Sequence, residues 1–106
     1  MLISAAALAR VLPHRSTEKC RPILHGLLVQ TDGTIVATNG HTLGKETDAV
    51  TDDRPAADLI LTITKDVEKM VKALARHEEA TVAVTVEAES VTWHDEGTGY
   101  AFTIRG

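Results

Sequence analysis

The sequence predicts a single α+β domain in which two helices pack on antiparallel sheets. Three observations support this: the chain has 106 residues, 43% of them are apolar, and one order of elements occurs twice. That order is a strand, a helix and three strands, so a β-α-β-β-β unit occurs twice. The two halves share this order of elements but not their amino-acid sequence. We place the half-repeats at about 1–49 and 58–106, joined by a linker at 50–57 that contains Asp52-Asp53-Arg54-Pro55.

The first half opens with a strand and a helix that its capping and apolar residues define. A very short strand is predicted at residues 1–3, and Ser4 is a suitable N-cap for the helix that follows. Pro13 closes this helix, because proline cannot continue the backbone hydrogen-bond pattern. The apolar residues at helical spacing are Leu8, Val11 and Leu12.

Three strands are predicted next, because apolar and β-branched runs alternate there with turn residues. Gly33 and Gly40 lie in the two tight connections, where glycine adopts backbone conformations that other residues resist. The expected strands span 21–30, 34–39 and 42–48.

The second half repeats this order. A strand is predicted at 59–63, and Thr64 caps a helix that runs to about His77. Three further strands are expected on either side of a loop at 95–99: 81–88, 90–94 and 100–105.

The second helix separates apolar from cationic side chains. At about 100° per residue, its apolar residues gather on one face and its cations gather on the opposite face. A row of cations can follow a phosphate backbone without reading bases, because ammonium–phosphate contacts carry no sequence information. Arg10 and Arg15, in and after the first helix, would add to this basic surface. The row, at spacings of four, three and four, consists of Lys65, Lys69, Lys72 and Arg76.

A second interpretation of this helix remains open. The cations can simply form the solvated face of an amphipathic helix, and Glu68 and Lys72 are a favourable pair four residues apart. A solvated face usually mixes both signs of charge, whereas the outermost arc of this helix carries only cations. On the helix alone we favour the solvated face, and only together with the hairpin motif described below do we favour proximity to DNA.

Composition excludes several classes of protein. The net charge of −4 argues against binding nucleic acid through overall positive charge, although a local basic face remains compatible with it. Cys20 is the single cysteine, so no intrachain disulfide forms, and we expect a reducing, cytoplasmic location. The apolar run at 2–12 is too short for a membrane span and lacks the basic start of a signal peptide.

The sequence predicts no enzyme and no cofactor. Its five histidines are scattered, without an HExxH pattern or paired cysteines, so we expect no metal site. His25 and His41, on neighbouring predicted strands, are the one pair that could meet around a metal ion, and we disfavour that interpretation. No phosphate-binding glycine loop and no GxSxG motif occurs.

Two motifs in the first half resemble a known family. Arg21-Pro22-Ile23-Leu24 is followed, after the turn at Asp32-Gly33, by Ala37-Thr38-Asn39-Gly40-His41. This order is similar to that of the bacterial DNA sliding clamp, the beta subunit of DNA polymerase III and its processivity factor. By element order the resemblance covers nearly the whole chain; by residue motif it covers about 8–44.

The resemblance implies a DNA-clamp (processivity-fold) domain. In that family two helices of each domain line the inner wall of a ring, and the sheets form its outer shell. An apolar pocket on the outer surface receives short peptides of polymerases and other partners. The matching peptide-binding positions in this chain are Leu24, Thr38, Gly40, His41 and Leu43.

The chain departs from the family at two of these motif positions. It has Asn39 where the family usually has Asp, and Thr42 where the family usually has Arg, so a polar contact at the pocket rim is missing. The simpler interpretation is that Leu24 and Leu43 belong to the core and that Asn39-Gly40 is an ordinary turn.

Together these features lead us to expect a non-enzymatic, clamp-like processivity factor. It would bind double-stranded DNA non-specifically through the basic helix residues and polymerase or other clamp-binding peptides through the outer pocket. A ring built from this chain would need head-to-tail homo-oligomers. The alternative is a single-domain, clamp-derived adaptor or decoy that binds such peptides without encircling DNA.

Overall fold

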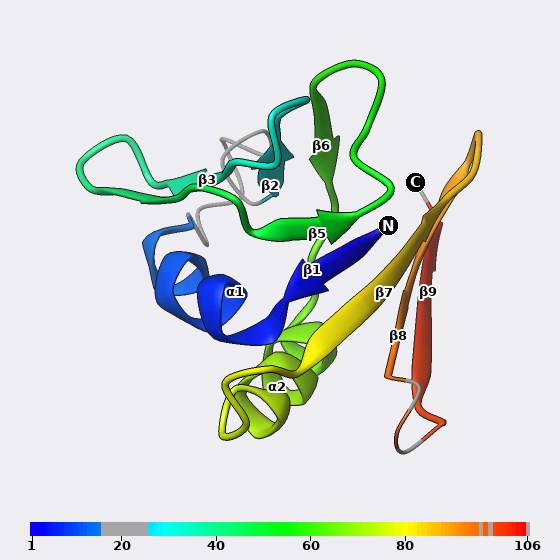
Figure 1. The fold of residues 1–106 in the computed structure, drawn as a ribbon. Helices are drawn as coiled ribbons and strands as arrows, with labels where there is room; N and C mark the ends of the chain where they lie inside the picture. Colours follow the sequence, from blue (N-terminus) through cyan, green and yellow to red (C-terminus); the bar gives the residue numbers. More distant parts are fainter. Residues whose placement is uncertain (16–25, 96, 98, 106) are drawn as a thin grey trace.

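Two antiparallel sheets and two α-helices make up the described part of the chain in a computed structural model (Figure 1). The structure describes residues 1–15, 26–95, 97 and 99–105. The larger sheet has the strand order β5-β1-β7-β8-β9, formed by Val50–Asp52, Leu2–Ser4, Thr81–Val86, Ser90–His94 and Ala101–Arg105.

The second sheet interlocks with the first through exchanged strands. β1 belongs to the first half of the chain but pairs with β7, where Leu2 lies opposite Ala83. β6 belongs to the second half but pairs with β2, where Leu28 lies opposite Ile60. This sheet has the order β4-β3-β2-β6, formed by Leu43–Glu46, Ile35–Thr38, Leu27–Val29 and Leu59–Leu61.

The α+β class is confirmed, but residues 50–52 correct the predicted linker. They form β5, which pairs antiparallel with β1 and has no counterpart in the second half among the described residues. Val50 is fully buried, and residues in left-handed conformations, Asp48 at φ 52° and Asp53 at φ 54°, lie on either side of the strand. The linker prediction rested on the polar residues after Val50 and overlooked the burial of that side chain.

The helices begin where the sequence predicted. α1 spans Ala5–Val11, and the Ser4 hydroxyl accepts a hydrogen bond from the Ala7 backbone N–H at 3.2 Å. A 3₁₀ turn, η1 at Leu12–His14, contains Pro13 and ends this segment. α2 spans Lys65–Leu74, about three residues shorter than expected, and residues 75–77 continue as a turn.

Thr64 caps α2, and its Oγ1 accepts a hydrogen bond from Val67 N–H at 3.4 Å. The segment before it is held by Trp93 of β8, whose indole N–H donates to the Thr62 carbonyl at 3.0 Å. Trp93 is fully buried, so this hydrogen bond ties one sheet to the start of α2 inside the core.

The core lies between the helices and the sheets. α1 and α2 lie next to each other (Figure 1), and each contributes its apolar face. The fully buried large side chains include Trp93, Ile3, Leu8, Leu27, Ile35, Leu61, Val67 and Val71. In the described part of the chain, no helix is long and apolar enough to cross a membrane.

Of the predicted strands after α1, the one at 90–94 is found with the same limits as β8, and the others are shorter than predicted. Of the strand predicted at 21–30, residues 27–29 form β2, while 21–25 lie outside the described residues. The turn before β3 is stabilised locally, because the Thr34 backbone N–H donates to the Asp32 carboxylate at 2.9 Å. This hydrogen bond lowers the pKa of Asp32 from its ordinary value.

Candidate nucleic-acid interface

The cation row of α2 lies on the exposed side of the helix. Lys65, Lys69 and Lys72 are exposed, and Arg76 is exposed in the turn after Leu74. The opposite face is buried against the core by Val67, Met70 and Val71. Among the described residues, none of the four cations forms an ion pair. The four residues are therefore exposed, as the helical period predicted.

Arg10 and Arg15 differ from this row because each has a carboxylate partner. The Arg10 guanidinium pairs with Glu46 of β4, and 62% of the Arg10 side chain remains exposed. Arg15 Nε donates to Glu68 Oε1 at 2.6 Å, and only 8% of its side chain is exposed. We predicted that both arginines contact DNA together with the lysines, because the sequence does not indicate which carboxylates pair with them.

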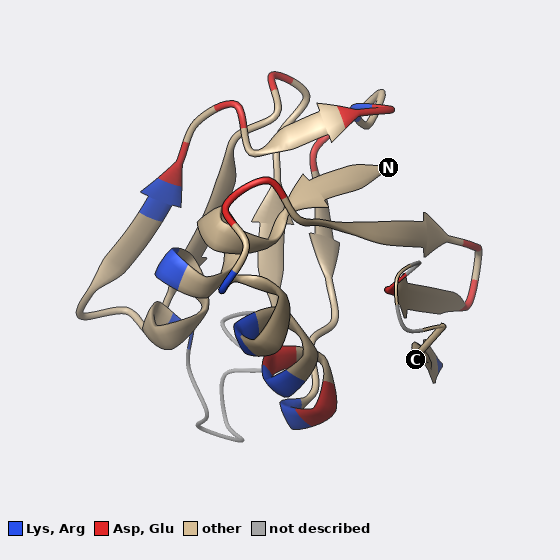
Figure 2. Cartoon of the chain, turned by 60° about the horizontal axis from the view of Figure 1, so that its bottom comes forward, with Lys and Arg blue, Asp and Glu red and all other residues tan. Residues whose placement is uncertain are grey.

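Two carboxylates flank the cation row on α2. Figure 2 shows the helices with cationic positions in blue and acidic positions in red. At about 100° per residue, Asp66 and Glu68 fall on opposite sides of the row. Glu68 faces α1, where Arg15 binds it, and Asp66 lies on the side of β9. The positive potential is therefore confined to a narrow row, consistent with an acidic protein overall.

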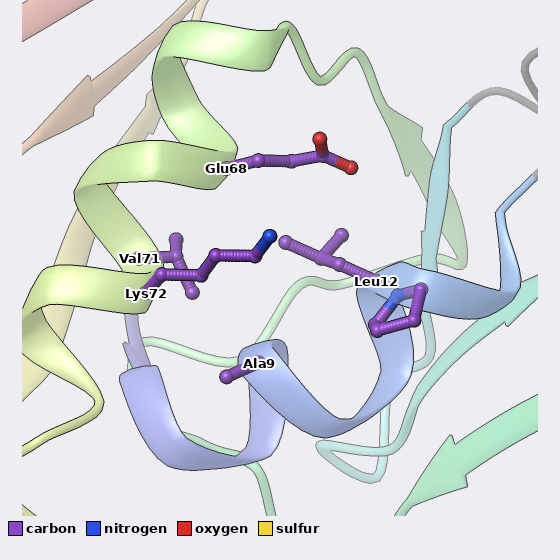
Figure 3. Close-up of a pocket in the computed structure, with 6 residues that line it drawn as sticks. Ala9, Leu12, Glu68, Val71 and Lys72 are labelled. Atoms are coloured by element: carbon purple, nitrogen blue, oxygen red, sulfur yellow. The ribbon is translucent and has the colours of Figure 1, made fainter.

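A cavity of about 150 Å³ lies between the two helices. Its floor is apolar, and Figure 3 shows the side chains of Glu68 and Lys72 extending from α2 into the same gap. The residues around it are Ala9, Leu12, Pro13, Glu68, Val71 and Lys72.

Four of the five residues predicted to bind peptides lie at the tip of the β3–β4 hairpin. Thr38 pairs with Leu43 across the two strands, and Gly40, with φ 91°, and His41 lie between them. Leu43 is 60% exposed, so it does not belong to the core. Leu24, the fifth predicted residue, lies outside the described residues.

Hydrogen bonds hold this tip in one conformation. Asn39 Oδ1 accepts from the backbone N–H groups of His41 and Thr42, each at 2.8 Å. Thr38 Oγ1 accepts from the Gly40 N–H at 3.1 Å and donates to the Thr42 carbonyl at 2.7 Å. Asn39 is therefore a turn residue, as the simpler interpretation held, while His41 and Leu43 remain available to a partner.

The tip is also attached to η1, which the sequence did not indicate. His14 Nδ1 lies 3.1 Å from Thr42 Oγ1. Gly44 permits this approach, because a Cβ there would lie 2.5 Å from His14 Cδ2 and 3.0 Å from Val11 Cα. Thr42, which stands where the family usually has Arg, thus binds the protein's own chain.

A larger apolar cavity, of about 420 Å³, lies between α2 and β9. The sequence analysis did not predict this cavity. Its walls include Met70 and Leu74 of α2 and the aromatic rings of Tyr100 and Phe102. Tyr100 is 66% exposed. The available signal was the placement of two of the three aromatic residues close to the chain's end. The rim carries Asp66, Lys69, His77 and Asp95.

The described residues contain no group of three or more His, Cys, Asp or Glu side chains that could hold a metal ion. His41 is exposed at the hairpin tip, while His25 lies outside the described residues, so the disfavoured pairing of these two remains untested.

Comparison with known proteins supports the fold. The structure is similar to the crystal structure of the DNA polymerase III beta chain of Streptococcus pneumoniae, with a TM-score of 0.65 and 16% sequence identity. The match covers 99% of this chain and 29% of that chain, so the described domain spans less than a third of that protein. No family model and no curated protein matches the sequence. The similarity establishes a clamp-like fold, in agreement with the resemblance inferred from the motifs.

Proposed function

We propose that the protein is a non-enzymatic, clamp-like processivity factor that binds the DNA backbone through α2. The observation that carries this proposal is the row of four exposed cations, three on α2 and Arg76 in the turn after it, none of which is ion-paired among the described residues. The clamp-like fold supports it, because the row lies on a helix of a domain that resembles the beta chain.

The dimensions of the row suit a phosphate backbone. From Lys65 to Arg76 it extends about 16 Å at 1.5 Å per residue. Double-stranded DNA carries one negative charge per roughly 1.7 Å of axis, so several phosphates lie within reach of the row. Lysine ammonium groups on flexible stems attract phosphates without fixing a position, which allows a protein to move along DNA.

Enclosing DNA requires more than one such domain, and head-to-tail association of copies would provide it. Within the described fold, β4 and β9 are each one edge of their sheets, and β6 and β5 are the opposite edges. β4 presents the exposed Leu43, and β9 borders the apolar cavity with Phe102. Pairing β4 of one copy with β9 of the next would satisfy the backbone hydrogen-bonding groups of these two edges.

Partner peptides would dock at the hairpin tip. Thr38, Gly40, His41 and Leu43 lie together there, and the hydrogen bonds of Asn39 hold the backbone ready, which reduces the entropy lost on binding. Leu24, the fifth position that the resemblance implies, lies outside the described residues and stays a prediction.

Salt-dependent DNA binding tests the central proposal. Lys69→Gln with Lys72→Gln should reduce the slope of log affinity against log salt by about 2, since each phosphate contact contributes about 0.9. A charge-matched control, Thr47→Glu with Thr85→Glu at exposed positions away from α2, should leave the slope near that of the wild type. Equal effects of the two pairs would refute a local DNA interface.

A second candidate is an adaptor or decoy that binds clamp partners without encircling DNA. The exposed Leu43 and the net charge of −4 favour it. The adaptor would bind polymerase-derived peptides, lose that binding on Leu43→Ala, and show no salt-dependent affinity for DNA. Peptide binding that survives Leu43→Ala would exclude docking at the hairpin tip.

A further inference from the structure

Arg15 is the least exposed of the cations predicted to contact DNA. It follows η1, and its Nε donates to Glu68 Oε1 at 2.6 Å. Only 8% of the Arg15 side chain is exposed, against 62% for Arg10. A phosphate would have to displace both the surrounding protein and the carboxylate in order to reach this guanidinium. Arg15 is therefore poorly placed for DNA contact.

Glu68 is the carboxylate that most directly competes for Lys72. The two residues are four apart on α2, in the order that favours a Glu–Lys pair on a helix. Figure 3 shows both side chains extending into the gap between the helices. Nevertheless no ion pair joins them, and Glu68 pairs with Arg15 instead.

The geometry points to a positioning role for Arg15: it holds Glu68 so that Lys72 stays available to a phosphate. This inference rests on the proposed function and assigns Arg15 to a task other than DNA contact. Guanidinium suits the task because it is always charged and more weakly hydrated than ammonium, so it tolerates the partly buried position. Without Arg15, the Glu68 carboxylate, which is 26% exposed, would be left to pair with Lys72, four residues further along the same helix.

Direct phosphate contact by Arg15 and the positioning of Glu68 by Arg15 predict different results for the double substitution of Arg15 and Glu68. If Arg15 contacts phosphate itself, Arg15→Gln removes one contact, and Glu68→Gln cannot restore it. If Arg15 instead acts on DNA binding by holding Glu68, Arg15→Gln removes the phosphate contact of Lys72, and adding Glu68→Gln restores that contact. Glutamine keeps most of the volume of each side chain while removing its charge.

The experiment measures the salt dependence of DNA affinity for the wild type, both single variants and the double variant. We expect Arg15→Gln to reduce the slope by about 0.9, Glu68→Gln to leave it unchanged, and the double variant to return to the wild-type slope. In a Lys72→Gln background, Arg15→Gln should have no further effect. An unchanged slope in Arg15→Gln, or an equally reduced slope in the double variant, would overturn the positioning role.

Two further measurements test the positioning role separately from folding and from DNA binding. The first controls for loss of folding, and the second requires no DNA. Arg15→Met with Glu68→Leu replaces both ions by apolar side chains and should fold and bind with the wild-type slope. Limited acetylation without DNA, read by mass spectrometry, should show Lys72 less reactive relative to Lys69 in Arg15→Gln. If the wild type fails to bind DNA, the proposed function fails, while an unchanged Lys72-to-Lys69 ratio would overturn the pairing by itself.

Discussion

The two helices carry their cations in different ways. α1 is a seven-residue helix with buried side chains at Ala5, Ala7, Leu8 and Val11, and the arginines in and after it are bound to Glu46 and Glu68. α2 has ten residues, buries one face and leaves its row of cations exposed. The difference teaches that a cation on a helix is available to a ligand only where the tertiary fold brings no carboxylate to it.

The flanks of α2 extend this comparison. On the side of α1, the Arg15–Glu68 ion pair joins α2 to the segment after η1, and a cavity of about 150 Å³ lies between the helices. On the side of β9, the apolar surfaces of Met70 and Phe102 face a cavity of about 420 Å³. The flank toward α1 is thus held by an ion pair within the protein, while the flank toward β9 has an open apolar cavity.

The largest expected effect comes from the core face of α1. Leu8 is fully buried, so Leu8→Ala should lower the free energy of unfolding by about 2–5 kcal/mol through lost transfer energy and a cavity. Urea unfolding followed by the fluorescence of Trp93, the single tryptophan, measures this change. Lys65→Ala on the exposed face of α2 is the control, and we expect it to stay within about 0.5 kcal/mol of the wild type. Similar losses for the two variants would contradict the assigned faces.

The helix caps should have a smaller effect that sharpens the contrast between α1 and α2. Ser4→Ala and Thr64→Ala should each cost about 0.5–2 kcal/mol, because each leaves a backbone N–H of the first turn without its partner. We expect Ser4 to matter at least as much, since its hydrogen bond is 3.2 Å against 3.4 Å and its helix is shorter. Thermal unfolding measures both, with Thr47→Ala in an exposed turn as the control. A clearly larger loss at Thr64 would reverse this ranking.

The smallest expected effect concerns the exposed ion pair between α1 and β4. Arg10→Gln should lower stability by only about 0.2–1 kcal/mol, because solvent screens a cation whose side chain is 62% exposed. The loss should shrink further at high salt. Glu46→Gln should reproduce it, and the double variant should lose little more than either single one. Strongly additive losses in unfolding experiments would show that the two side chains act separately.

Some elements of the fold were predictable because their signals are local. Ser4 and Thr64 cap the helices as predicted, and the period of α2 separated the buried Val71 from the exposed Lys72. β5 was not predicted, because its single deeply buried residue, Val50, is followed by polar residues typical of a loop. Three residues are too few to show an alternating pattern.

The candidate site was predictable to the same extent. The cation row follows from helical spacing, and the grouping of Thr38, Gly40, His41 and Leu43 follows from one hairpin. The Arg15–Glu68 pair joins residues 53 positions apart, and no short-range pattern indicates it. The cavity between α2 and β9 likewise depends on where a strand from the end of the chain packs.

The sequence by itself determined where the helices begin, which face of α2 meets the core and which residues form the hairpin tip. These features depend on hydrogen bonds and side-chain periods that span only a few residues. The tertiary structure alone decided that β1 and β6 exchange sheets, that Arg10 and Arg15 are paired, and that an apolar cavity borders β9. Such outcomes depend on which distant segments meet once the chain closes its long loops, and the free energy of that choice is shared by the whole core.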